Sequence, residues 1–115
     1  KYVFAVFMSQ FLLYSLHAQS RQLDSLDQLI TKAKTDTDRI NLNIKKINIL
    51  SRSNLDTAIY LSKQQLVQAE KLNFYKGIIK LHNQLASSYN FKGLIRTLYK
   101  KNSWHTGQKK AYGAE

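Results

Sequence analysis

The sequence predicts an all-α fold built from antiparallel helix hairpins, and three observations carry this prediction. The 115-residue chain has no proline and only four glycines, so it lacks the turn signals that an all-β chain needs. Leu, Ile, Gln, Lys and Ala, which favour helix, are abundant. The stretch from Ala58 to Gly93 has the pattern of two amphipathic helices joined near Asn73. A chain of this length holds one domain at most.

Residues 1–18 have the pattern of a secretory signal peptide. Lys1 is followed by the mostly apolar run YVFAVFMSQFLLYSL, and polarity returns at His17. The run falls short of the roughly 20 apolar residues that a membrane span needs. We therefore expect cleavage between Ala18 and Gln19, and export to the periplasmic or extracellular side. A buried or interfacial N-terminal helix and an uncleaved membrane anchor are the alternatives.

Residues 19–36 are expected to form a lead-in helix. Its apolar residues recur at i, i+3, i+7 and i+10 and line one side of the helix: Leu23, Leu26, Ile30 and Ala33. The segment from Thr35 to Asp38 then supplies short side chains with oxygen atoms, which accept hydrogen bonds from the free N–H groups of a first helical turn. A new helix is expected to begin there.

Residues 37–73 are expected to form a helix pair. Four residues of the first helix face inward or nearly so: Ile40, Ile44, Ile47 and Leu50. A polar stripe occupies another face at i, i+4, i+7 and i+11: Asn41, Lys45, Asn48 and Arg52. The turn follows, with Ser53 or Asn54 as N-cap of the second helix. Six residues share one side of that second helix: Ala58, Leu61, Gln65, Leu66, Ala69 and Leu72. Asn73 is the expected helix stop.

Residues 74–93 are expected to form the next helix, which starts near Phe74 or Tyr75 and ends at Gly93. Five side chains are expected to face inward: Ile78, His82, Leu85, Ala86 and Tyr89. Gly77 inside a helix costs about 1 kcal/mol relative to alanine, so it is either tolerated or marks the helix start. Residues 94–115 then form a basic tail.

The spacing of large and small residues resembles the tetratricopeptide (TPR) repeat family over about residues 35–93. Leu85, Ala86, Tyr89 and Gly93 match the first-helix positions of a unit, and Ala58 matches the second-helix alanine of the unit before it. The step between units, about 40 residues instead of 34, is similar to TPR arrays that follow a signal peptide in bacterial sensor histidine kinases and transcriptional regulators.

This resemblance implies an incomplete α-solenoid that acts as a protein–protein interaction scaffold, the sensory or binding part of a larger exported or membrane-linked signalling protein. The sequence departs from the family pattern at His82 and Lys46, and the pattern is lost after Gly93. We therefore expect residues 94–115 to be a truncated or altered end of a longer repeat array.

The resemblance also implies a concave groove, lined by the first helix of each unit. The candidate groove residues are Asn41, Lys45, Asn48 and Arg52 from one helix, and Lys80, Asn83, Ser87 and Asn90 from the other. Their amide and ammonium groups suit an extended peptide, especially an acidic segment or a C-terminal carboxylate. An ordinary solvated helix face is the alternative. The candidate residues for packing between repeats are Ala58, Leu66, Ala69, Leu72, Leu85, Ala86, Tyr89 and Gly93.

The charge distribution indicates which kinds of partner the chain attracts. The formal charge is +11, and the stretch from Lys71 to Ala114 holds nine Lys or Arg residues and no Asp or Glu. Such a bias attracts acidic peptides, nucleic acid or anionic lipid. The chain has no arginine cluster with interleaved aromatic residues, which argues against a nucleic-acid site. A small basic nucleic-acid-binding protein and a membrane-surface protein with an uncleaved anchor remain the alternatives. Self-association through an exposed apolar end of the array is a further expectation.

No residue pattern points to catalysis. The chain has no cysteine, and His17, His82 and His105 are far apart without carboxylate partners at metal-ligand spacing. No glycine-flanked nucleophile turn and no glycine-rich phosphate loop occurs in the sequence. We predict neither an enzyme nor a metal or cofactor site.

Overall fold

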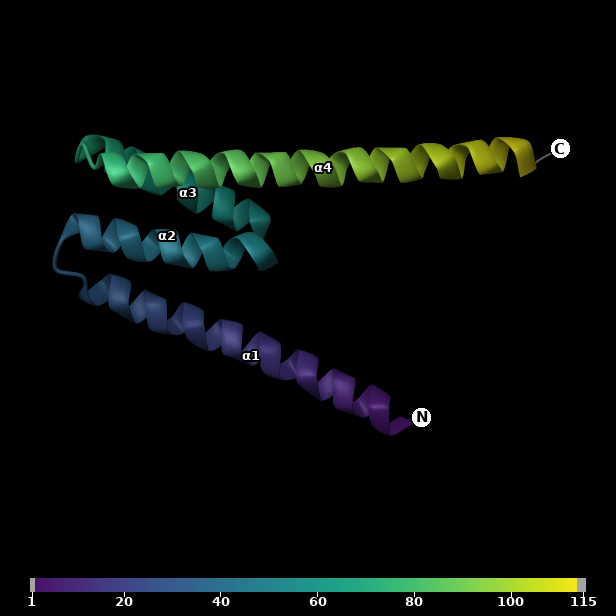
Figure 1. Cartoon of the computed structure of the whole chain (residues 1–115), viewed down its shortest axis with the longest axis horizontal. Helices are drawn as coiled ribbons and strands as arrows, with labels where there is room; N and C mark the ends of the chain where they lie inside the picture. Colours follow the sequence, from purple (N-terminus) through teal and green to yellow (C-terminus); the bar gives the residue numbers. More distant parts are fainter. Residues whose placement is uncertain (1, 114–115) are drawn as a thin grey trace.

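The computed structural model describes the backbone of residues 2–113 and the side chains of residues 2–101. Over this part, the chain forms four helices and no strand (Figure 1): α1 (Tyr2–Lys32), α2 (Asp36–Ser53), α3 (Leu55–Lys71) and α4 (Tyr75–Gly113). The prediction of an all-α fold is confirmed.

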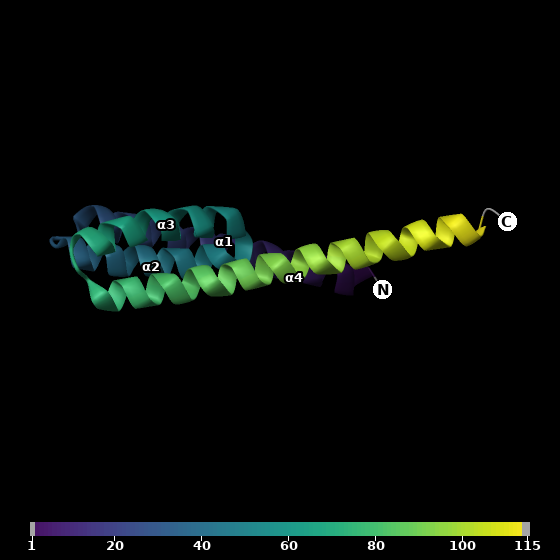
Figure 2. The same cartoon turned by 90° about the horizontal axis from the view of Figure 1, so that it is seen from above.

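Each helix packs against the next one along the chain. α1 contacts α2, α2 contacts α3 and α3 contacts α4, and α2 also touches α4. Because consecutive helices are antiparallel, α2 and α4 run in the same direction (Figure 1). The molecule measures 67 × 39 × 15 Å, because the N-terminal half of α1 and the C-terminal half of α4 extend past the ends of α2 and α3 (Figures 1 and 2).

α2 is the central helix of the core. All four of its predicted inward residues are buried: Ile40, Ile44, Ile47 and Leu50. Ala58 and Ala69 of α3 and Leu81 of α4 complete the core cluster, each fully buried. The small side chains of Ala58 and Ala69 let α3 approach its neighbours closely, and the larger Leu81 fills the core.

Side-chain caps define the N-terminal ends of both α2 and α3. The Thr35 hydroxyl accepts a hydrogen bond from the backbone N–H of Asp38 at 3.1 Å, at the start of α2. The Asn54 carboxamide oxygen accepts one from the N–H of Thr57 at 3.2 Å, so Asn54 and not Ser53 caps α3. The lead-in helix ends at Lys32, short of the expected residue 36, because Thr35 already caps the following helix.

A short turn joins α3 to α4 at the predicted place. Asn73 has a φ of 52°, a left-handed conformation that asparagine tolerates better than most residues. The N–H of Phe74 donates to the carbonyl oxygen of Ala69 at 2.9 Å, which closes the turn. α4 begins at Tyr75, so Gly77 lies inside its first turns rather than at its start.

The expected helix end at Gly93 is wrong, because α4 continues to Gly113. No glycine in the described backbone has a positive φ, so Gly93 does not adopt the left-handed conformation of a helix cap. A single glycine costs a helix only about 1 kcal/mol. The Leu, Ile, Arg and Lys residues that follow favour helix, and no proline stops it.

The expected inward face of α4 is only partly right, because Ile78 packs against the core and Leu85 is partly buried but the other three residues are not. The structure turns Leu81, Leu85 and Ser88 toward the body, whereas His82, Ala86 and Tyr89 are exposed. This face stays exposed in the described part of the chain, apart from the Tyr89 ring, which the ammonium group of Lys63 in α3 approaches to 5.6 Å.

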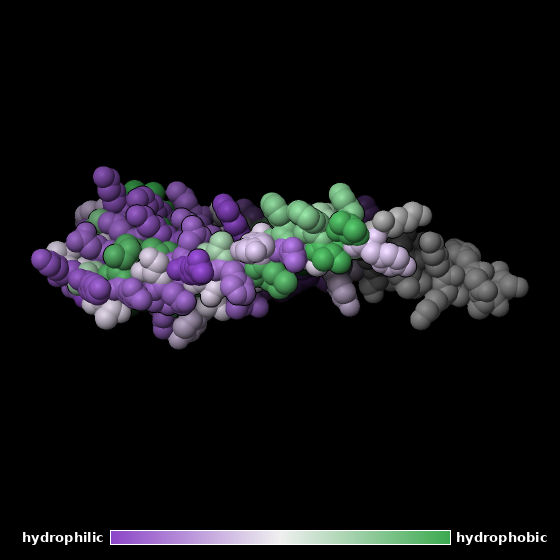
Figure 3. All heavy atoms as spheres, turned by 90° about the horizontal axis from the view of Figure 1, so that it is seen from below, coloured by the Kyte–Doolittle hydropathy of each residue, from purple (hydrophilic) through white to green (hydrophobic). Residues whose placement is uncertain are grey.

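α1 is a single helix with two different halves. Every residue from 2 to 18 is exposed, and Gln19 is the first with a partly buried side chain. Figure 3 shows apolar side chains gathered over the N-terminal half and polar ones over the rest. Within the described residues, no helix is both long and apolar enough to cross a membrane.

Candidate peptide-binding groove

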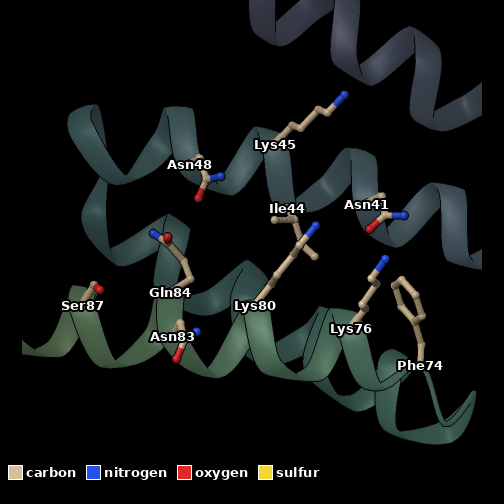
Figure 4. A pocket seen from close by; sticks show the side chains of 10 residues that line it. All are labelled: Asn41, Ile44, Lys45, Asn48, Phe74, Lys76, Lys80, Asn83, Gln84 and Ser87. Carbon is tan, nitrogen blue, oxygen red and sulfur yellow. The ribbon is translucent and has the colours of Figure 1, made fainter.

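A hollow of about 820 Å³ lies between α2 and α4. Figure 4 shows the ten residues that line it, drawn from both helices and from the turn before α4: Asn41, Ile44, Lys45, Asn48, Phe74, Lys76, Lys80, Asn83, Gln84 and Ser87. We call this hollow the α2–α4 groove.

The helical repeat explains why these residues meet. Asn41, Lys45 and Asn48 recur at i, i+4 and i+7, which places them on one face of α2. The residues Lys80, Asn83 and Ser87 of α4 recur at i, i+3 and i+7. Because the two helices run in the same direction, the two polar rows lie along the same groove.

The groove is cationic and its lysines are free of ion pairs. None of its ten lining residues is acidic, and three of them are lysines: Lys45, Lys76 and Lys80. The described side chains form three ion pairs, Arg39–Asp36, Lys46–Asp27 and Lys92–Asp56, and none of these involves a groove lysine. The ammonium groups are therefore available to an anionic ligand.

A second hollow of about 570 Å³ continues the groove toward the C-terminal end of α2. It is lined by Ser51, Arg52, Leu55, Gln84, Ser87, Ser88 and Phe91. Gln84 and Ser87 belong to both hollows. Ser88 is only 3% exposed, and its hydroxyl has no hydrogen-bond partner among the described residues. Leu55 and Phe91 give this end a more apolar lining than the lysine-rich part has.

The structure brings most of the candidate groove residues together. Six of the eight line the α2–α4 groove: Asn41, Lys45, Asn48, Lys80, Asn83 and Ser87. Arg52 lines the second hollow, and Asn90 lines neither. Lys76, one helical turn before Lys80, also lines the groove and was not predicted. Gln84, Ile44 and Phe74 line it as well, and their positions depend on how the helices pack.

The candidate packing residues divide into two groups. Ala58 and Ala69 are fully buried, and Leu66 and Leu85 are partly buried. Leu72, Ala86, Tyr89 and Gly93 are exposed, so none of them is buried within the described part of the chain. Tyr89 instead lies under the ammonium group of Lys63, 5.6 Å from its ring centre, which is a cation–π contact between α4 and α3.

The side chains considered for metal binding lie apart in the described part of the chain. Among the described side chains, no group of three His, Asp or Glu residues lies close enough to hold a metal ion. His17 and His82 are both exposed and lie on different helices, and His105 lies outside the described side chains.

Comparison with known proteins found no match: no family model, no curated protein and no solved structure matches this chain. The resemblance to TPR repeats therefore rests on the residues quoted above and stays a prediction.

Proposed function

We propose that this chain is a protein–protein interaction scaffold that binds an extended acidic peptide in the α2–α4 groove. One observation carries the proposal: lysines and amide side chains from two helices line one continuous hollow, and no acidic residue shares it. The TPR resemblance, which implies a peptide groove on these same two helices, supports the same function.

The chemistry of the groove suits an acidic peptide. The carboxamides of Asn41, Asn48 and Asn83 can both donate to and accept from a peptide backbone, which an extended strand leaves unpaired. The ammonium groups of Lys76 and Lys80, which extend from α4 toward α2, supply charge for carboxylates, and Lys45 adds a further cation on the rim nearest α1 (Figure 4). Exposed ion pairs contribute only about 0.2–1 kcal/mol each, so we expect modest affinity that weakens as salt is added.

Charge reversal tests the groove. We expect Lys45→Glu/Lys80→Glu to abolish binding of a fluorescein-labelled peptide of glutamate, aspartate and alanine, measured by fluorescence anisotropy. The matched control is Lys34→Glu/Lys71→Glu, which changes the net charge equally at exposed sites outside the groove. The control should weaken binding only slightly. Equal loss in both variants would mean that overall charge attracts the peptide, and the groove assignment would fail.

We also infer that residues 1–18 are a leader that is removed when the protein is exported. The contacts support a division at this point. Every residue from 2 to 18 is exposed, whereas the Gln19 side chain donates to the carbonyl oxygen of Ile49 in α2 at 3.5 Å. Removing the leader would therefore cost the packed body no buried side chain.

The mass of the mature product tests the leader. After expression with its native N-terminus in a bacterial host, we expect a product that begins at Gln19 and lies outside the cytoplasm. An intact N-terminus in a membrane fraction would favour the uncleaved anchor instead.

A further inference from the structure

We propose that the distal part of α4, residues 91–101, docks onto an anionic lipid surface, a role separate from the peptide groove. The observation behind the proposal is an apolar face that no described residue covers. Phe91, Leu94, Ile95 and Leu98 recur at i, i+3, i+4 and i+7, which places them on one side of the helix. Their exposed fractions lie between 49% and 53%, although each is a large apolar residue.

Basic residues occupy the remaining sides of the same segment. Lys92, Arg96 and Lys100 recur at i, i+4 and i+8 away from the apolar face, and Lys101 flanks it. Lys92 is paired with Asp56 of α3 at 2.8 Å, whereas Arg96, Lys100 and Lys101 have no ion-pair partner among the described side chains. A helix with one apolar side and free cations on the others matches the pattern of helices that lie in the interface of an anionic bilayer.

The charge of α4 argues against a second copy of the chain as the partner. From Tyr75 to Gly113 the sequence contains no Asp or Glu. Two such helices facing each other would bring like charges together, which opposes association. An anionic surface, by contrast, attracts the free cations of the segment.

The shape of the segment favours a surface over a folded acidic partner. α4 runs past the ends of α2 and α3, so the helices of the body do not cover its distal part (Figures 1 and 2). Phe91 at the start of this face borders the second hollow beside α2 and α3, whereas Leu94, Ile95 and Leu98 line none of the hollows described above and lie farther along the projecting helix, where an extended lipid surface can reach them.

Site-specific labels test whether this face enters the bilayer. The chain contains no cysteine, so Leu98→Cys and Thr97→Cys each allow one polarity-sensitive fluorophore in the full chain. Residues 97 and 98 are neighbours, but a turn of about 100° per residue places Thr97 away from the apolar face.

With vesicles of equal parts phosphatidylcholine and phosphatidylglycerol, we expect a blue shift at position 98 and little change at 97. Vesicles of phosphatidylcholine alone should give a much smaller shift at position 98. The proposal is overturned if position 98 does not respond, or if positions 97 and 98 respond equally. A chain that floats with vesicles while position 98 stays unchanged would be held by its N-terminal apolar segment instead.

A pair of matched variants gives a second readout. We expect Leu94→Gln/Leu98→Gln to weaken co-sedimentation with the anionic vesicles about tenfold or more, because two apolar side chains no longer leave water. Gly93→Gln/Thr97→Gln introduces the same residues at the same spacing on the other side, where nothing lies within 4 Å of a Cβ built at Gly93. This control should bind like the original chain, and equal weakening in both variants would refute the apolar face as the contact.

Discussion

Gly77 is a position where two effects of one substitution oppose each other, and the structure decides which is larger. The Phe74 ring packs directly over Gly77, and a Cβ atom built there would overlap with Cδ1 of that ring. Real Cβ contacts do not approach this closely, so the ring must move. Phe74 is half-buried against the core and lines the α2–α4 groove, which limits where the ring can go.

The expected size of the effect follows from the two terms. Replacing glycine by alanine inside a helix favours folding by about 1 kcal/mol. Forcing extra volume against a packed side chain costs about 1–3 kcal/mol. We therefore expect Gly77→Ala to lower the free energy of unfolding by about 1 kcal/mol, whereas the same change in a Phe74→Ala background should raise it by about 1 kcal/mol.

Urea unfolding followed by far-UV circular dichroism measures this sign change. Gly93→Ala is the control in the same helix, because its new methyl group would meet nothing within 4 Å. This control should stabilise the helix by up to about 1 kcal/mol or leave it unchanged. If Gly77→Ala stabilises the chain as Gly93→Ala does, the close contact between Phe74 and Gly77 does not exist in solution.

Three further predictions concern the body of the fold. Ile47→Ala should lower the free energy of unfolding by about 2–5 kcal/mol, because Ile47 is fully buried in the central helix, and urea unfolding measures it. Asn54→Ala should cost about 1 kcal/mol through the lost cap of α3, while Asn54→Ser should recover most of that stability. Asp27→Asn removes the 2.6 Å ion pair with Lys46. Because both side chains are partly exposed, we expect the free energy of unfolding to fall by at most about 1 kcal/mol. Faster amide hydrogen exchange in residues 19–32 would report the loosened contact between α1 and α2.

The sequence correctly predicted the features that depend on a few neighbouring residues. The caps at Thr35 and Asn54 and the stop at Asn73 use hydrogen bonds and backbone conformations that one short segment supplies by itself. The inward face of α2 was also predicted correctly, because its isoleucines repeat at the helical period and the helix packs against neighbours on more than one side.

The α2–α4 groove could be predicted only in part from the sequence. The polar rows on α2 and α4 are visible in the sequence, and the family resemblance suggested that they face each other. Phe74, Ile44 and Gln84 could not be assigned to it, because their positions depend on how closely the two helices approach. That distance depends on the packing of the core, which joins residues of α2, α3 and α4.

The errors all concern contacts between distant segments. The amphipathic pattern of α4 contains two apolar faces, one with Leu81 and Leu85 and one with Ala86 and Tyr89, and the sequence does not say which face meets the body. The structure chooses the first, since Leu81 reaches full burial in the core. Likewise the glycine at position 93 permits a turn, but no following segment packs back to form one, so the helix continues. The sequence by itself determined the helices, their caps and the cationic character of the chain, because these follow from neighbours along the backbone. Tertiary packing alone decided which face of α4 is buried, which residues line the groove and which apolar surface stays exposed. The burial of a side chain depends on which other segment of the chain lies opposite it.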